Sequence, residues 1–381
     1  MRAGREQDSP YGSRLRRWSL SRHCDFLNVY ALPRKEIYEP QPGRPECIRR
    51  YSDLGRHRID DSLRVVVTGA AGFIGSHLAD RLLADGHEVV GIDSFTDYYS
   101  RAAKERNMAQ ARSQRAFTFA ELDLAQDDLA SALEGAEVVY HLAGRPGVRA
   151  ALMQFDQYWR ENVIATHRLL EAVKGHPLKC LVYAGSSSVY GDAEVFPTGE
   201  SALPAPLSPY GVTKLAGEHL SYVYWKNFHV PSVRLRYFSV YGPRMRPDLM
   251  LARAMQSMRD GAMFDVFGDG EQTREFTYVG DAVEGTIRAA TRGAPGDLYN
   301  LGGGSSVTVN HVLDLVADIA GKKLRRRHTA RQAGDHRRAG ASISRARIQL
   351  GWEPRTSLRE GLAEQWKWFR ESAQEDAPNA V

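Results

Sequence analysis

The sequence has few cysteines and no long hydrophobic run. Its 381 residues include three cysteines, Cys24, Cys47 and Cys180. They are too few and too widely spaced for a disulfide framework or a zinc site, and they fit a reducing compartment. The longest uncharged stretch near the start, residues 65–76, is shorter than the roughly 18 apolar residues that a membrane span requires. We therefore expect a protein without a metal site that crosses no membrane.

The N-terminus also lacks the pattern of a signal peptide. Arg2, Arg5 and Glu6 are followed by no apolar segment. This predicts a cytoplasmic protein.

A strong charge of one sign is absent from most of the chain. The formal net charge is +5, and residues 1–62 hold 13 Lys+Arg and 9 Asp+Glu, a balance of +4 that leaves +1 for the other 319 residues. This distribution does not favour a nucleic-acid partner. Residues 1–62 show no sustained period, so we expect a poorly ordered N-terminal extension or a start codon assigned too far upstream. A targeting or partner-binding arm is the less favoured alternative.

From Leu63 onward the chain alternates short β-branched runs with helical patterns. Strands are expected within residues 63–69, 87–93, 116–122, 136–144, 179–185 and 232–242. Helical spacing is clearest over 151–173 and 209–228. The alternation predicts an α/β fold with a Rossmann-like, doubly wound parallel sheet over residues 63–242. Residues 243–372 are expected to form a smaller α/β domain from which some segments return to the main sheet, and 373–381 a tail.

A glycine-rich turn between the first strand and the first helix is the clearest motif. The segment VVVTGAAGFIGSHLAD places Gly69, Gly72 and Gly75 there. Such glycines let the backbone approach a pyrophosphate at the helix N-terminus. Asp93 ends the second strand, where its carboxylate can bind ribose hydroxyls and repel a 2′-phosphate. We interpret the motif as an NAD site, in preference to a structural turn alone.

A tyrosine and a lysine four residues apart are the candidate acid–base group. Tyr210 and Lys214 lie on one face of the helix expected over 209–228. A nearby ammonium can lower the pKa of a tyrosine from about 10, which would make Tyr210 a general base. The alternative is an aromatic residue and a snorkelling lysine on an ordinary amphipathic helix.

Six segments, taken together, resemble the extended short-chain dehydrogenase/reductase family of nucleotide-sugar epimerases and dehydratases. They are TGAAGFIGSHL, HLAG, SSSVYG, SPYGVTK, RYFSVYGPR and FGDGEQTREFTYV, and the resemblance extends from about Leu63 to Phe369. It implies NAD, a UDP-sugar substrate bound mainly by residues 243–372, and a homodimer formed through two helices of each subunit. Further cofactor contacts implied by the resemblance are Phe73, Ile74, Asp123, Leu124, Leu142, Ala143, Gly144, Tyr237 and Val240. Gly144 departs from the commoner alanine, and we expect the change to be tolerated.

The resemblance also implies a catalytic serine. It is Ser186 by register with VYG, or Ser187 if the register differs by one. Tyr210 would then take the proton of the sugar C4 hydroxyl during a transient oxidation, with Lys214 holding the nicotinamide ribose. Dehydratases of this family carry an Asp–Glu pair in the segment before VYG, and uronate decarboxylases usually carry a glutamate at the position of Ser188. Because this chain has three hydroxyls there, it is expected to be an epimerase.

Two arginine-containing stretches resemble those of UDP-glucuronate 4-epimerases. AGRPGVRA contains Pro146 and Arg149, and VYGPRMRPDLML contains Arg244 and Arg246. A guanidinium can pair with a sugar carboxylate through two hydrogen bonds, which favours conversion of UDP-glucuronate to UDP-galacturonate. Alternatively these arginines bind phosphate or lie on the surface, and the chain is a UDP-glucose 4-epimerase. A UDP-glucuronate decarboxylase and an inactive NAD-binding sensor or assembly protein are less favoured.

The remaining substrate contacts are expected on the basis of the same resemblance. Arg274 would neutralise the diphosphate, and Arg331 and Asp335 would bind phosphate and ribose. Ser187 and Ser188, or Arg246, would hold the carboxylate away from the geometry that releases carbon dioxide. After Asp335 the family's usual AD is replaced by GASISRA, so this contact departs from the family's pattern. Ser239 completes the expected substrate set.

Overall fold

The computed structural model describes residues 62–304, 306–331 and 337–375. Cys24, Cys47, Asp335 and the predicted extension up to residue 61 lie outside the described residues. The cysteine that is described, Cys180, is buried and carries a free thiol.

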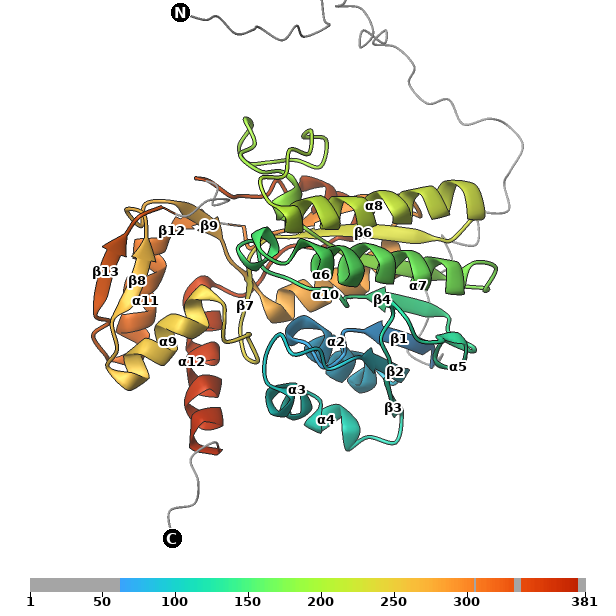
Figure 1. Ribbon diagram of the computed structural model, residues 1–381, viewed down its shortest axis with the longest axis horizontal. Coiled ribbons are helices and arrows are strands. Elements are labelled where there is room, and N and C mark those ends of the chain that lie inside the picture. The colour runs from blue at the N-terminus through green and yellow to red at the C-terminus, as the bar shows by residue number, and fades with distance from the viewer. Residues whose placement is uncertain (1–61, 305, 332–336, 376–381) are drawn as a thin grey trace, which may run out of the picture. The chain divides into compact units, whose positions relative to one another are not determined.

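A seven-stranded sheet forms the centre of the described part (Figure 1). Its strand order is β11-β6-β5-β4-β1-β2-β3, and every adjacent pair is parallel. The strands are β1 (Arg64–Thr68), β2 (Glu88–Asp93), β3 (Phe117–Glu121), β4 (Val138–His141), β5 (Cys180–Ser186), β6 (Ser232–Tyr237) and β11 (Leu298–Leu301). The predicted doubly wound parallel sheet is therefore confirmed. The strand order reverses beside β1, and such folds bind ligands at the carboxyl ends of these strands.

Both faces of the sheet are covered by helices, which explains the continuous apolar run of β1. Val65 and Val67 point into a core with α2 and α10, whereas Val66 points into a core with α7 and α8. Strands buried on both faces need apolar residues at every position. The helices are α2 (Phe73–Ala84), α3 (Arg101–Asn107), α4 (Ala109–Arg112), α5 (Ala130–Leu133), α7 (Ala165–Val173), α8 (Pro209–Phe228) and α10 (Val279–Arg292).

The helix expected over residues 151–173 is not continuous. It consists of a 3₁₀ turn, Ala150–Leu152, then α6 (Phe155–Trp159), a π-helical turn, Arg160–Ile164, and α7. Asn162 lies in the π turn, where its side chain bonds to the main chain of Arg145 and to the hydroxyl of Thr213. Single π turns within helices occur frequently at functional sites, and this one lies beside the cavity described below.

The rest of the chain builds a smaller part around its own core, at the left of Figure 1. It contains α9 (Met250–Asp260), β8 (Phe264–Phe267), α11 (Val309–Ala320), β13 (Arg326–Thr329) and α12 (Leu358–Glu375), and β8 pairs in parallel with β13. Two short strand pairs lie outside the seven-stranded sheet: β7 (Val240–Tyr241) with β10 (Thr277–Tyr278), and β9 (Thr273–Glu275) with β12 (Ser306–Thr308). Residues 243–372 also supply β11 to the main sheet, so the domain boundary at 242 stays a prediction.

None of the helices within the described ranges has the length and apolar character needed to cross a membrane.

Candidate active site

A cavity of about 730 Å³ opens at the carboxyl ends of the central strands. Most of the residues expected at the site line it. They are Gly69, Gly72, Phe73, Ile74, Gly75, Asp93, Asp123, Leu124, Leu142, Ala143, Gly144, Pro146, Arg149, Ser186, Ser187, Ser188, Tyr210, Lys214, Tyr237, Ser239, Val240, Arg246 and Arg274. Arg331 is exposed and is not among the lining residues of this cavity. One cavity thus collects motifs separated by more than 200 residues.

The glycine-rich turn shapes one end of the cavity. Gly69 has φ +72° and lies so close to the segment that follows β4 that a Cβ would be 2.8 Å from the nitrogen of Ala143. A Cβ at Gly75 would overlap the carbonyl oxygen of Gly69. Among the described residues, no side chain caps the start of α2 and its first turn contains no acid. The first N–H groups and the positive end of the helix dipole therefore remain available to a pyrophosphate.

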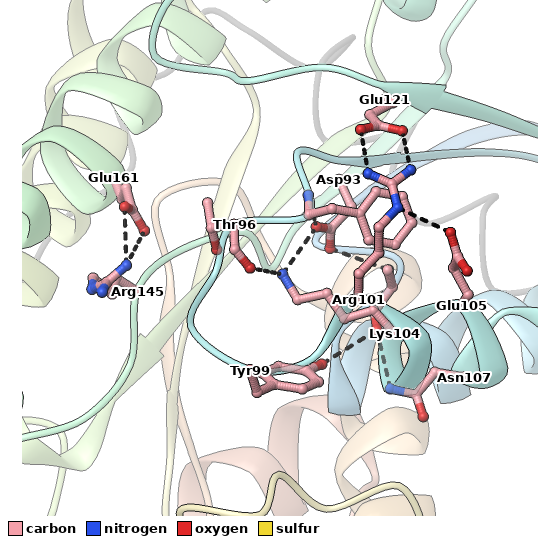
Figure 2. Close-up of polar contacts among 12 residues, drawn as sticks. Asp93, Thr96, Tyr99, Arg101, Lys104, Glu105, Asn107, Glu121, Arg145 and Glu161 are labelled. Atoms are coloured by element: carbon pink, nitrogen blue, oxygen red, sulfur yellow. Dashed lines mark hydrogen bonds and ion pairs between the residues drawn. The ribbon is translucent and has the colours of Figure 1, made fainter.

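Asp93 lies beside this turn, at the end of β2. Its carboxylate accepts hydrogen bonds from the main-chain nitrogens of Phe95 (2.9 Å) and Ala71 (3.3 Å). The Nζ atom of Lys104 lies 3.6 Å from the Asp93 carboxylate and donates to the carbonyl of Thr96 at 3.0 Å (Figure 2). Two groups of opposite charge thus lie where an adenosine ribose is expected, and each can bind a hydroxyl.

Lys104 was missed by the sequence reasoning. It is only 5% exposed, and it belongs to a helix, α3, in which lysine and arginine otherwise suggest a solvated face. The same segment secures the glycine turn, because Tyr99 and Asn107 both donate to the carbonyl of Ala71 (Figure 2). Arg101, by contrast, pairs with Glu105 and Glu121 at the surface. Only the tertiary structure distinguishes the buried lysine from its exposed neighbours.

Asp123 and Leu124 lie beyond Asp93, after β3. One oxygen of Asp123 accepts a hydrogen bond from the nitrogen of Ala125 at 2.8 Å, and the other pairs with Arg160 at 2.5 Å. Leu124 is buried beside them. An acid next to an apolar side chain is suited to the amino edge and the ring of adenine, as the resemblance implies.

Ser186, Tyr210 and Lys214 meet near the middle of the cavity. Ser186 ends β5, and α8 begins at the cap Ser208, whose side chain accepts from the nitrogen of Gly211 at 3.1 Å. The cap and Pro209 start the helix immediately before Tyr210, so Tyr210 lies on its first turn and Lys214 on the second. The Ser186 hydroxyl bonds to Tyr210 and lies 3.1 Å from the hydroxyl of Ser188.

The electrostatics of Tyr210 are dominated by its burial. Burial raises its pKa, while the hydrogen bond from Ser186 and the positive charge of Arg246 act in the opposite direction. Burial also lowers the pKa of Lys214 to about 8, and its ammonium donates to the carbonyl of Ala184 at 3.1 Å. Desolvation therefore outweighs the groups that lower the pKa of Tyr210 in the protein alone, and the expected effect of Lys214 on this pKa stays a prediction.

Gly144 has a geometric reason for its departure from alanine. A Cβ at this position would be 2.8 Å from Oδ1 of Asn162 and 3.1 Å from Nζ of Lys214. Glycine therefore permits the close approach of the loop after β4 to Asn162 and to Lys214.

The other end of the cavity is lined by arginines. Arg149 lies 4.1 Å over the ring of Phe267, and Arg246 makes a two-bond ion pair with Asp248. The other arginine of the stretch VYGPRMRPDLML, Arg244, is not among the lining residues of the cavity: it pairs with Asp80 of α2 at 2.7 Å. Two arginines only two residues apart thus face different surroundings.

Another pair in the wall, Arg145 and Glu161, was not singled out from the sequence. Arg145 is 7% exposed, and its Nη1 atom lies 3.2 Å from the Glu161 carboxylate (Figure 2). Its guanidinium also contacts the rings of Tyr98 and Tyr158. Its position directly after Gly144 was the only signal available. Within the described ranges, His, Cys, Asp and Glu form no group of three or more that could hold a metal ion.

The open parallel sheet, the glycine-rich turn at its switch point and the Ser–Tyr–Lys group beside it define a dinucleotide-binding protein of the short-chain dehydrogenase/reductase type. Residues 65–302 match the NAD dependent epimerase/dehydratase family, and the chain belongs to this family.

Similar proteins agree with this assignment. One relative, described as an uncharacterized UDP-glucose epimerase YtcB of Bacillus subtilis, is 42% identical over 79% of this chain and 96% of its own. A UDP-glucuronate 4-epimerase of Thermodesulfobacterium geofontis is 35% identical over 81% of this chain and 96% of its own. The solved structure of a UDP-glucuronic acid 4-epimerase from Bacillus cereus, in complex with UDP-glucuronic acid and NAD, is 39% identical, with a TM-score of 0.79 over 81% of this chain and all of that chain.

Proposed function

We propose that this chain catalyses the NAD-dependent 4-epimerisation of a UDP-sugar, and that the preferred reaction converts UDP-glucuronate to UDP-galacturonate. The observation that carries the proposal is the convergence of Ser186, Tyr210 and Lys214 on a turn whose other side chains, Ser187 and Ser188, are hydroxyls. The named activity of the Thermodesulfobacterium and Bacillus cereus relatives supports the acidic sugar.

The residues present fit NAD. The turn at Gly69, Gly72 and Gly75 would hold the pyrophosphate, because added Cβ atoms would fill the space that a close backbone approach needs. Asp93 and Lys104 would bind the adenosine ribose, and Asp93 would repel an added 2′-phosphate. When bound, NAD would supply reversible hydride transfer with the sugar C4 carbon and, in its oxidised form, a positively charged ring.

The chain's own residues move the proton and hold the sugar. Tyr210 would accept the proton of the C4 hydroxyl, while Ser186 would donate a hydrogen bond to the same oxygen. Lys214 would hold the nicotinamide ribose and favour the phenolate of Tyr210. After the 4-ketosugar turns over, its opposite face would receive the hydride at the C4 carbon, and Tyr210 would return the proton to the C4 oxygen. Arg274 would neutralise the diphosphate, and Arg331 would lie near the nucleotide.

The hydroxyl of Ser188 separates this reaction from its alternatives. Elimination of water needs an additional acid and base, and neither Ser187 nor Ser188 supplies a carboxylate. A 4-keto uronate is a β-keto acid that loses carbon dioxide readily. Either Arg246 or the hydroxyls of Ser187 and Ser188 would hold the carboxylate away from that geometry.

UDP-glucose is the second candidate substrate. The Bacillus subtilis relative, 42% identical, is described as a UDP-glucose epimerase. In addition, Arg246 already has an internal counterion, Asp248, so a neutral sugar would leave no unpaired charge.

The test is to incubate the purified protein with UDP-glucuronate, without added NAD, and to follow the products by NMR. UDP-galacturonate is expected, and a UDP-pentose would assign the chain to the decarboxylases. UDP-glucose is tested in the same way. Turnover of UDP-glucose alone would support the epimerase reaction and contradict the acidic substrate. Bound NAD with no activity on either sugar would favour the sensor or assembly function.

We also propose that the chain forms a homodimer in the cytoplasm. Apolar side chains are exposed on the neighbouring segments 150–173 and α8, which pack against each other. They are Leu152, Met153, Phe155, Trp159, Ile164, Val212, Tyr222, Val223 and Phe228. A solvated patch of this kind favours an interface. Light scattering should give twice the mass of 42.6 kDa, and Trp159→Glu should shift it toward the monomer.

A further inference from the structure

Arg246 is the cavity-lining arginine whose charge reaches the catalytic tyrosine, and its own counterion is part of the same loop. Its Nε and Nη2 atoms donate to the two oxygens of Asp248 at 3.0 and 3.1 Å. The Arg246 side chain is 15% exposed and that of Asp248 is 39% exposed. This parallel pair of charge-assisted bonds uses the Nε–Nη2 edge of the guanidinium, so a ligand carboxylate that binds the remaining Nη1 and Nη2 hydrogens would share the Arg246 charge with Asp248.

Asp248 is held by a residue from the end of the cavity where the cofactor is proposed to bind. Its Oδ2 atom accepts a hydrogen bond from the hydroxyl of Tyr98 at 3.2 Å. The guanidinium of Arg246 lies 5.6 Å from the ring centroid of the same tyrosine. Tyr98 belongs to the loop between Asp93 and Lys104, so this contact joins the loop at the ribose to the loop at the sugar.

The two arginines that flank Tyr98 in the cavity wall each pair with a carboxylate of the protein. Arg145 lies 5.1 Å from the Tyr98 ring centroid and has its own acid, Glu161. Both arginines of this wall therefore have a carboxylate from the protein. Removing one member of a mostly buried pair leaves a charge that needs another partner.

We propose that Asp248 is a specificity-determining residue: by keeping Arg246 paired, it lets the cavity accept a neutral hexose and limits its preference for an acidic one. This inference rests on the proposed function, in which Arg246 faces the C6 group of the sugar. Without the Asp248 charge, a uronate would supply the missing counterion, whereas a neutral hexose would leave Arg246 desolvated and unpaired. Replacing Asp248 with a neutral residue should therefore narrow the substrate range toward the acidic sugar.

Binding in a form that does not turn over tests this directly. In the full chain carrying Tyr210→Phe and loaded with NAD, calorimetry gives Kd for UDP-glucuronate, UDP-glucose and UDP, with and without Asp248→Asn. We expect the ratio of Kd for UDP-glucose to Kd for UDP-glucuronate to rise at least about tenfold, the effect of one hydrogen-bonded charge. UDP binding should be unchanged, which shows that the nucleotide part is intact. A ratio that stays the same or falls overturns the proposal.

Two further variants show whether the effect acts through Arg246. In an Arg246→Gln background, Asp248→Asn should leave the ratio unchanged, because the pair no longer exists. Persistence of the effect there contradicts the proposal. Asp248→Ser removes the same charge with a smaller side chain, and the same shift is required of it if Asp248→Asn does not fold.

The design keeps this inference separate from the proposed function. Because the Tyr210→Phe background binds without turnover, the Kd ratios decide the role of Asp248 even if the wild-type chain epimerises only UDP-glucose. Absence of UDP-galacturonate from the NMR assay would overturn the proposed reaction. The Kd ratios would still test the role of Asp248 in substrate binding.

Discussion

The two halves of the cavity are built in different ways. The cofactor half consists of main-chain turns and short motifs that directly follow strands, such as the glycine turn after β1 and Asp93 at the end of β2. The half proposed to bind the sugar consists of long side chains from several segments, among them Arg149, Arg246 and Arg274. A contact made by the backbone is specified by a few adjacent residues. A contact made by arginine depends on which acid or ring lies nearby.

The arginines show what this difference means. Arg244 and Arg246 belong to the same short stretch, yet one pairs with Asp80 on the cofactor helix and the other with Asp248 in the cavity. The residue type allowed both placements. The lesson is that backbone motifs locate a site reliably, whereas the partner of each arginine has to be found in the structure.

The largest effect should come from the group where the two halves meet. Tyr210→Phe is expected to lower kcat by about 10³-fold, within the 10²–10⁴ range of general acid–base catalysis, because the proton acceptor is lost. Steady-state epimerase assays measure it, with bound NAD determined on the same sample. Tyr222→Phe, at an exposed tyrosine of the same helix, is the control and should retain activity. Equal losses of kcat in the two variants would show that Tyr210 is not the proton acceptor.

The buried ion pair between α2 and the loop carrying Arg246 should matter mainly for stability. Asp80→Ala leaves Arg244 without its acid and is expected to destabilise the protein by about 3 kcal/mol, because that charge remains mostly buried. The exposed pair Arg326–Asp314 is the matched control, and Asp314→Ala should cost less than about 1 kcal/mol. Urea unfolding followed by fluorescence compares the two. Similar values would contradict the assigned role of burial.

The cofactor half can be altered by a single methyl group. Gly75→Ala should weaken NAD binding at least about tenfold, since the added Cβ overlaps the carbonyl of Gly69 and overpacking costs on the order of 1–3 kcal/mol. The NAD content of the purified protein measures this. Gly199→Ala, whose Cβ would meet its nearest atom at 3.9 Å, should retain the cofactor. Full NAD content in Gly75→Ala would contradict a close contact between the backbone of this turn and the cofactor.

The smallest effect concerns pH. Arg246 lowers the pKa of Tyr210, since a positive charge favours the phenolate. Arg246→Gln should therefore raise that pKa and move the rising limb of the pH–rate profile to higher pH. UDP-glucose is the suitable substrate because it carries no C6 carboxylate. Arg327→Gln, an exposed arginine on β13, should leave the profile in place. A shift to lower pH, or equal shifts in both variants, would contradict this influence of Arg246.

Much of the fold and of the cofactor site was predictable because it depends on local patterns. The alternation of strands and helices, the glycine turn and Asp93 all appear where the sequence placed them. The broken helix at Asn162 was not, since its π turn follows from bonds to Arg145 and Thr213, which are remote in sequence. Lys104 was missed for a similar reason, because burial and the approach to Asp93 depend on how α3 packs.

By itself, the sequence determined the parallel sheet, the glycine-rich turn and the order of the motifs that line the cavity, because these follow from periodicity, glycine geometry and residue spacing. Only the tertiary structure decided how the charges pair. It desolvated Tyr210 enough to raise its pKa, directed Arg244 to Asp80, and gave Arg246 its counterion in Asp248. The physical reason is that desolvation and ion pairing depend on distances between loops, and those distances are set only when the sheet and its helices pack together.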